Sequence, residues 1–175
     1  MEEEVGFQVT DEVVVGDLTA VQQQLKPICQ NVLVEIEGGK VQVSKDKASK
    51  ALILDFRMVE GIPTEEDGET RMKYVGAKFS NGFMDLLVWA DPAVKTSNWY
   101  KQQTYLLPFK SLKKALSIDV KEEVRINDEW LSSLKGRQIR LSIRHEEEQA
   151  LDQTTGKYVN TGSLKERIGS FKKAE

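Results

Sequence analysis

Several residue types are scarce in this chain, and their scarcity excludes whole classes of protein. The 175 residues include one cysteine, Cys29, and one histidine, His145. An internal disulfide and a zinc site built from cysteine and histidine are therefore excluded. So little cysteine is typical of a reducing compartment, and we expect a cytoplasmic protein without a metal or other cofactor.

Long apolar runs are missing as well. No stretch of about 18 apolar residues occurs, so no transmembrane helix is expected. The chain begins Met-Glu-Glu-Glu, whereas a secretory signal begins with basic residues that precede an apolar stretch. We therefore expect no membrane partner. With 39% hydrophobic and 30% charged residues, the composition is that of a globular protein with one core.

Charge is distributed unevenly, although the net charge is only −3. Residues 1–12 contain five acidic residues and no basic ones, while residues 163–175 contain four basic and two acidic ones. We predict a flexible acidic tail over 1–12, a domain over 13–162 and a loosely ordered basic tail over 163–175. A domain that is neutral overall can still carry a basic groove, because local potentials act over a Debye length of ~8 Å.

Alternating apolar and polar residues predict strands along much of the chain. We expect strands over 32–36 with an extension to 43, over 52–58, 71–79, 83–89 and 138–144, and a returning strand from 158. Gly38-Gly39 indicates a bend or bulge, and residues 61–68 an acidic turn. Asn81-Gly82 predicts a tight hairpin between two strands, and residues 152–157 predict another turn.

Three short helices are predicted, over 17–25, 108–116 and 128–134, the last capped by Asn127. The element order is thus an antiparallel meander, a helical insert and a final hairpin. This order predicts a mainly β fold: an OB-fold-like antiparallel five-stranded barrel, with the helical insert between the early and the late strands.

The strand over 138–144 has one apolar and one basic face. Ile139, Leu141 and Ile143 share one parity, and Arg140 and Arg144 share the other. Guanidinium groups along an exposed strand can follow a chain of phosphates, although ordinary solubilising charges would give the same pattern.

Several segments together resemble a known family. They are Val34-Glu35-Ile36, Ser44-Lys45, 52–61, 112–116, 134–137 and 156–160, within roughly residues 28–162. In their order and spacing the chain resembles small phage-encoded single-stranded DNA-binding proteins with an OB-fold. The resemblance implies binding of single strands, with little sequence preference, during phage DNA replication or recombination in an infected bacterial cell. Many such proteins end in an acidic tail that recruits partners, whereas this sequence ends Phe-Lys-Lys-Ala-Glu.

Binding of this kind requires cations for phosphates and exposed rings for bases. We take candidates from loops and from the outward parity of predicted strands. The candidate DNA-binding residues are Lys45, Lys47, Lys50, Arg57, Lys73, Tyr74, Lys78, Trp99, Tyr100, Arg140, Arg144, Lys157 and Tyr158. Each has a simpler interpretation, because the lysines could belong to a solvated loop and Tyr74 could pack at the barrel rim. We assign Trp89 and Trp130 to packing.

The sequence also bears on two other classes of function, enzymes and protein-interaction modules. No phosphate-binding loop, dinucleotide motif or metalloprotease motif occurs, and Glu65-Glu66-Asp67 is explained by a turn, so we expect no enzyme. The acidic N-terminus and neutral centre also suit a protein-interaction module, such as a virion assembly factor or a host-targeting inhibitor. Replication or recombination proteins are candidate partners beside single-stranded DNA, and a homo-oligomer is compatible with the sequence.

Overall fold

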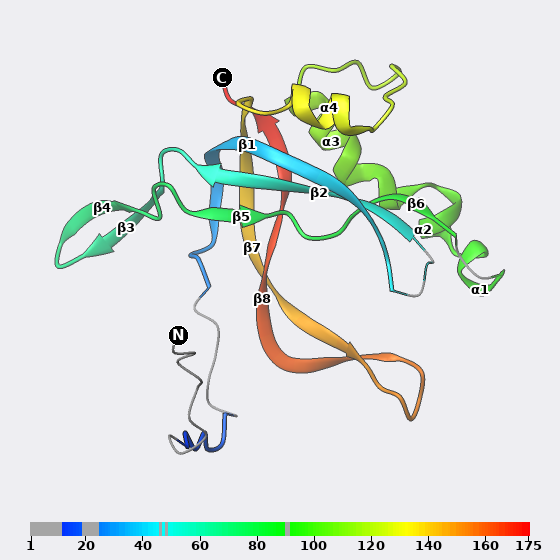
Figure 1. Cartoon of the computed structure of the whole chain (residues 1–175), viewed down its shortest axis with the longest axis horizontal. Coiled ribbons are helices and arrows are strands. Elements are labelled where there is room, and N and C mark those ends of the chain that lie inside the picture. The colour runs from blue at the N-terminus through cyan, green and yellow to red at the C-terminus, as the bar shows by residue number, and fades with distance from the viewer. Residues whose placement is uncertain (1–11, 19–24, 46, 48, 90–91) are drawn as a thin grey trace, which may run out of the picture.

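The fold is built mainly from antiparallel strands (Figure 1). The computed structural model describes residues 12–18, 25–45, 47, 49–89 and 92–175. The strands are β1 (Cys29–Val43), β2 (Ser49–Met58), β3 (Ile62–Glu66), β4 (Glu69–Lys73), β5 (Lys78–Ser80), β6 (Met84–Val88), β7 (Gln138–Leu151) and β8 (Tyr158–Lys173). The helices are α1 (Pro92–Lys95), α2 (Asn98–Lys101), the 3-10 helix η1 (Thr104–Leu106), α3 (Leu107–Ala115) and α4 (Asp128–Ser133).

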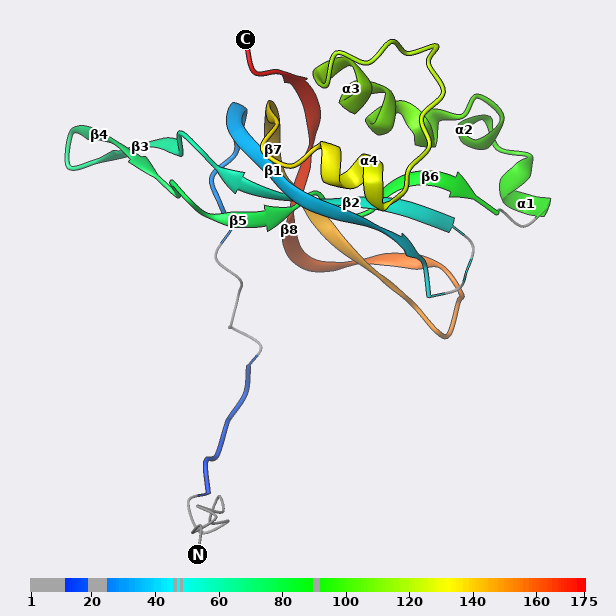
Figure 2. The ribbon, with the colours of Figure 1, turned by 45° about the horizontal axis from the view of Figure 1, so that its top comes forward.

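One curled sheet carries most of these strands. β5 and β6 both pair with β2, and β2, β1, β7 and β8 follow side by side. The sheet curls into a half-barrel, with α3 and α4 on one side (Figure 2). These helices lie between β6 and β7 in the chain, at the place predicted for the helical insert. The predicted mainly β, OB-fold-like architecture is confirmed.

The core follows the predicted alternation along the strands. Ile36 of β1, Phe56 of β2 and Leu141 of β7 are fully buried. Each lies on the parity that the sequence marks as apolar. Leu112 of α3 and Leu131 of α4 join the same apolar cluster, so the helical insert covers the sheet.

The two helices predicted in the insert are present. The Asn127 side chain accepts a hydrogen bond of 2.9 Å from the Trp130 backbone N–H, as expected for an N-cap. The Trp130 ring lies 6.4 Å from the ring of Phe109, in agreement with the assignment of Trp130 to packing. None of the helices described in the structure has the length and apolar character needed to cross a membrane.

The hairpin predicted at Asn81-Gly82 is wrong, because β5 and β6 do not pair with each other. Both lie along the same edge of β2 (Figure 1). Asn81 fills the gap between them. Its side-chain oxygen accepts from the Leu54 N–H at 2.6 Å, and its side-chain nitrogen donates to the Leu52 carbonyl at 3.1 Å. An asparagine amide offers the same donor and acceptor as a peptide, so this side chain replaces one residue of the ladder.

The acidic turn expected over 61–68 and the single strand expected over 71–79 are also wrong. β3 and β4 form their own two-stranded sheet, which projects from the half-barrel (Figure 1). Asp67 and Gly68 both have positive φ at its tip, which fits a two-residue hairpin turn. A turn then separates β4 from β5, with positive φ at Tyr74 (66°) and at Gly76.

The loosely ordered tail expected over 163–175 is wrong for most of its length. β8 pairs with β7 as far as Lys173, and Phe171 is only 4% exposed. The basic residues concealed an alternation, since Lys165 and Arg167 are exposed whereas Glu166 and Ile168 are half-buried. Except for Glu12, the acidic tail predicted over 1–12 lies outside the described residues, as does most of the helix predicted over 17–25.

The segment before β1 links the two edges of the half-barrel. The Lys26 side chain forms an ion pair of 3.3 Å with Glu166 of β8 and lies 5.0 Å from the centre of the Phe79 ring in β5. The Lys26 backbone N–H also donates to Glu166 at 2.6 Å, and the His145 Nε2 lies 2.6 Å from the Lys26 carbonyl. Backbone and side-chain contacts of Lys26 therefore join the two edges, which a closed barrel would join by a strand pair.

Asn81→Ala is expected to lower the free energy of unfolding by about 1–3 kcal/mol, because the backbone groups of Leu52 and Leu54 lose their partner. Urea unfolding measures the change. The matched control is Asn160→Ala, which removes an exposed bond to Gln149 and should stay within about 0.5 kcal/mol of wild type. Equal effects of the two changes would contradict the role assigned to Asn81.

Candidate nucleic-acid interface

Lysine side chains from two parts of the chain meet at one end of the half-barrel. Ser49 pairs with Val88 and Lys50 with Leu87, so the β1–β2 turn lies beside the end of β6. Helix α1 begins shortly after β6. We call this region the lysine-rich end, and its lysines are Lys45, Lys47, Lys50, Lys95 and Lys101. All five are exposed, and none forms an ion pair with a residue that the structure describes.

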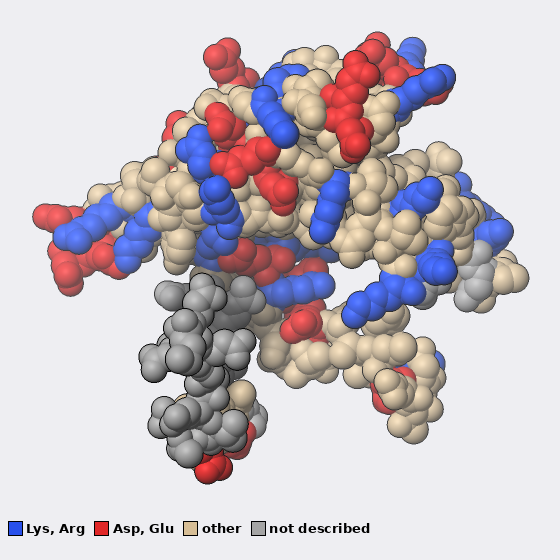
Figure 3. All heavy atoms as spheres, in the orientation of Figure 1, with Lys and Arg blue, Asp and Glu red and all other residues tan. Residues whose placement is uncertain are grey.

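The surface charge agrees with this grouping. In Figure 3, Lys and Arg side chains gather at the right-hand end, over the β1–β2 turn and α1–α2, with few acidic side chains among them. Over the projecting β3–β4 hairpin, at the left of the same view, acidic and basic side chains lie together. The positive potential of this face is therefore concentrated at the lysine-rich end.

Partly exposed aromatic rings lie at the same end. Trp89, directly after β6, is 45% exposed, and the Lys50 ammonium lies 5.2 Å from the centre of its ring. Trp99 in α2 is 42% exposed, and its ring lies 5.5 Å from that of Tyr105. Tyr100 stacks on Tyr105 at 6.0 Å. These contacts hold the rings in place while leaving part of Trp89 and Trp99 free to stack on a base.

The β7–β8 hairpin approaches this region from another part of the sheet. In both ribbon views its turn lies on the same side of the molecule as the β1–β2 turn (Figures 1 and 2). Lys157 and Tyr158 are exposed where β8 begins, beside the turn. The Thr154 backbone N–H donates to the Asp152 carboxylate at 2.9 Å, which lowers the pKa of Asp152 and stabilises the turn.

The outer face of β1, β2 and β5 carries neutralised cations. Arg57 forms ion pairs with Glu35 at 2.8 Å and Glu37 at 3.3 Å, and Lys78 lies 3.6 Å from Glu37. The hydrogen bond and charge of Glu35 raise the pKa of Arg57. Arg57 and Lys78 would have to leave these carboxylates before they could contact a phosphate.

On β6, burial raises the pKa of the half-buried Asp85 carboxyl.

Lys73 and Tyr74 do not join the lysine-rich end. Lys73 forms an ion pair with Glu66 across the β3–β4 hairpin. Tyr74 is half-buried against the core, which matches the simpler interpretation of this ring as packed at the barrel rim.

The Arg140 side chain is held by contacts within the fold. Its side chain donates to the Ala174 and Asn31 carbonyls, both at 2.9 Å, and lies 3.5 Å from Glu60. Arg140 pairs with Leu33 near the start of β1, whereas Lys45 follows its end. The two residues therefore lie near opposite ends of β1. Arg144 is exposed and lies farther along β7, opposite Arg167.

Three members of this region could not be recognised from sequence patterns. Lys95 and Lys101 lie in helices of four residues each, which are too short to show a periodic pattern. Trp89 follows a strand and was assigned to packing, yet nearly half of it is exposed. The signal that could have indicated Trp89 is its place in the sequence, shortly before the helix that carries Lys95.

No family model matches the chain, and a search of curated proteins gives no significant match. Within the described part of the chain, no three side chains of His, Cys, Asp or Glu are grouped so as to hold a metal ion.

Arg140→Ala is expected to lower the free energy of unfolding by about 1–3 kcal/mol, because two backbone carbonyls lose a charged donor. Lys172→Ala is the control, since Lys172 pairs with Arg140 across the sheet and is exposed. Chemical unfolding should place this control within about 0.5 kcal/mol of wild type. An unchanged midpoint for Arg140→Ala would show that its contacts contribute nothing to stability.

Proposed function

We propose that the protein binds single-stranded DNA with little sequence preference, at the lysine-rich end. The observation that carries this proposal is the occurrence of ammonium groups without a carboxylate partner beside partly exposed indole rings at one end of the half-barrel. The resemblance to phage single-stranded DNA-binding proteins supports a role in phage DNA replication or recombination.

The chemistry of this end suits a single strand better than a duplex. Lysine ammonium groups act as point charges and hold phosphates whatever the base sequence is. Trp89 and Trp99 could stack only on bases that are not already stacked within a duplex. In OB-folds, the equivalents of the β1–β2 and β7–β8 turns border the binding face, so Lys157 and Tyr158 would contact the strand from the opposite side.

A protein-interaction module remains the second candidate, and one observation favours it. The outer face of β1, β2 and β5 offers cations that are already paired with Glu35 and Glu37. Such a face presents mixed charge to a partner and little net attraction for phosphates. The two candidates differ in whether an oligonucleotide binds at all.

Replacing Lys45, Lys47 and Lys50 together by alanine is expected to weaken oligothymidine binding and to reduce its salt dependence. The slope of log K against log salt is negative, and the loss of three phosphate contacts should reduce its magnitude by about 2. Fluorescence anisotropy at several salt concentrations measures both quantities. The control replaces Lys110, Lys114 and Lys121, which are exposed and lie in or after α3.

Both triple variants remove the same charge, so only a localised site separates them. Equal weakening by the two sets would mean that general surface charge, and not the lysine-rich end, attracts the oligonucleotide. If wild-type protein binds no oligothymidine even at low salt, the proposal fails and the protein-interaction module is favoured.

Trp89→Ala is expected to reduce the affinity for oligothymidine by about 5- to 150-fold, because one stacked ring is worth ~1–3 kcal/mol. The same variant should lose part of the tryptophan quenching that the oligonucleotide causes in wild type. Tyr158→Ala provides a comparison at the opposite turn. Retention of full affinity and full quenching by Trp89→Ala would exclude Trp89 from the interface.

A further inference from the structure

Two arginines face each other across β7 and β8 without enough negative charge between them. Arg144 and Arg167 are direct register partners, so their side chains project from the same face of the sheet. Like charges placed directly opposite each other are destabilising. Such a pair needs compensation from a neighbouring acid or from a ligand.

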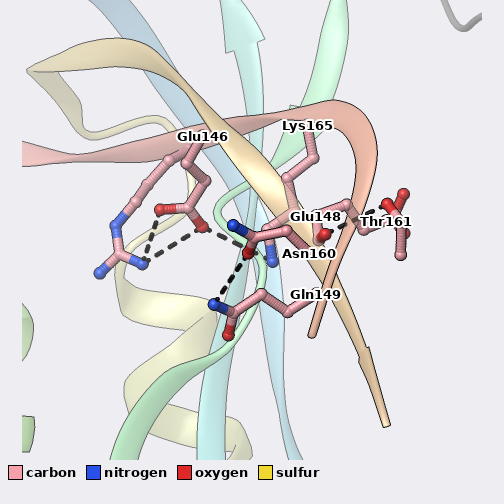
Figure 4. A network of polar contacts seen from close by, with 7 residues as sticks. Glu146, Glu148, Gln149, Asn160, Thr161 and Lys165 are labelled. Carbon is pink, nitrogen blue, oxygen red and sulfur yellow. Dashed lines mark hydrogen bonds and ion pairs between the residues drawn. The ribbon is translucent and has the colours of Figure 1, made fainter. Parts of the chain in front are cut away.

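The neighbouring acid is already shared. Glu146 lies 3.3 Å from the Arg167 guanidinium and 3.5 Å from the Lys165 ammonium (Figure 4 shows Glu146 and Lys165). Arg144 has no hydrogen bond or ion pair with any residue that the structure describes. Each of the other arginines has at least one such polar contact: Arg57, Arg71, Arg125, Arg137, Arg140 and Arg167. The Arg144 guanidinium is therefore free to donate hydrogen bonds to a ligand, and it lies beside a second cation, Arg167.

A cavity of about 290 Å³ lies next to this pair. Its lining residues are Arg144, Arg167, Ile168, Gly169 and Ser170 of the sheet, together with Leu107, Pro108 and Ser111 of α3. None of them is acidic. One water occupies ~30 Å³ in the liquid, so the space is large enough for a phosphate group with a sugar attached. We call it the arginine cavity.

An irregular strand segment shapes the floor of the cavity. The β7–β8 register shifts between Arg140 and Ser142, and Ser170 adopts a positive φ of 53°. Ser111 of α3 donates to the Phe171 carbonyl at 3.1 Å and so fixes the helix against this bulge. A Cβ atom at Gly169 would meet nothing within 4 Å, so the backbone there borders open space. Bulges are common beside binding sites, where they redirect groups toward a ligand.

The geometry points to a phosphate monoester as the ligand of the arginine cavity, either as the end of a nucleic acid strand or as a free nucleotide. Guanidinium groups present paired donors that match phosphate oxygens. A monoester carries close to two negative charges at neutral pH, which balances two arginines, whereas an internal phosphodiester carries one. Leu107 and Pro108 supply an apolar wall for the attached nucleoside. This site goes beyond the proposed function and does not depend on it.

Calorimetric titration of the full chain with dTMP, inorganic phosphate and thymidine tests the assignment. We expect binding of dTMP, weaker binding of phosphate and none of thymidine. Arg144→Gln should weaken dTMP binding at least tenfold, with partial recovery in Arg144→Lys. Arg125→Gln is the control, because Arg125 is highly exposed and lies away from the cavity lining.

A steric variant tests the cavity itself. Gly169→Val leaves both arginines in place and fills open space, so it should fold normally and also weaken dTMP binding. Absence of dTMP binding by wild type, equal binding of thymidine, or unchanged binding by both variants would each overturn the assignment.

Oligothymidines with a 5′-phosphate, a 3′-phosphate or hydroxyl ends identify the source of the phosphate. Preference for one phosphorylated end that disappears in Arg144→Gln indicates a strand terminus, whereas equal binding of all three, with dTMP binding retained, indicates a free nucleotide. The alanine variant of Lys45, Lys47 and Lys50, which should weaken oligothymidine binding, should keep dTMP binding. Failure of one site is thus distinguishable from failure of the other.

Discussion

The bend in β1 is the constraint on which the rest of the molecule depends. This strand pairs with β7 only up to Glu35, whereas it pairs with β2 as far as Val43, and its register shifts between Ile36 and Gly38. A Cβ atom at position 39 would lie 2.7 Å from the Leu54 side chain and 2.9 Å from the Ile53 carbonyl. Glycine therefore allows β1 and β2 to remain paired while the sheet curls, and it leaves room for Leu131 of α4 above them. Because β1 turns there, its far half carries the β1–β2 turn away from β7 and toward β6 and α1.

Arginine and lysine are used differently in this fold. The planar fork of arginine suits fixed partners, and most of the arginines hold carbonyls or carboxylates, as Arg140 and Arg57 do. The lysines of the lysine-rich end remain in solvent on long, mobile stems. Cations without a carboxylate partner lie beside exposed aromatic rings at the lysine-rich end, and Arg144 borders the arginine cavity, although the chain as a whole is slightly acidic. Local arrangement, and not net charge, determines where an anion would be attracted.

Much of the fold could be predicted because the strands of the core alternate regularly. Ile36, Phe56 and Leu141 show this alternation in sequence, and their burial follows from it. The prediction failed where a side chain replaced backbone, as at Asn81, and where the frequency of charged residues hid an alternation, as in β8. In the candidate site, the lysines of the β1–β2 turn could be selected from their loop alone. The partners of Arg57 and Arg140 come from other strands or from the chain end, so no local pattern could show that these cations are already engaged.

The link made by Lys26 gives this half-barrel a property that closed barrels lack. In a closed barrel, strand number and stagger determine the circumference, and any widening breaks a ladder of peptide bonds to neighbouring strands. Here the edges at Phe79 and Glu166 are bridged by the Lys26 side chain, and α3 packs against both β6 and β8. Separating these edges disrupts side-chain packing but leaves every strand pair intact, so the sheet can widen without loss of a peptide ladder. The spacing between the turns at its rim can then adjust to the thickness of whatever lies between them.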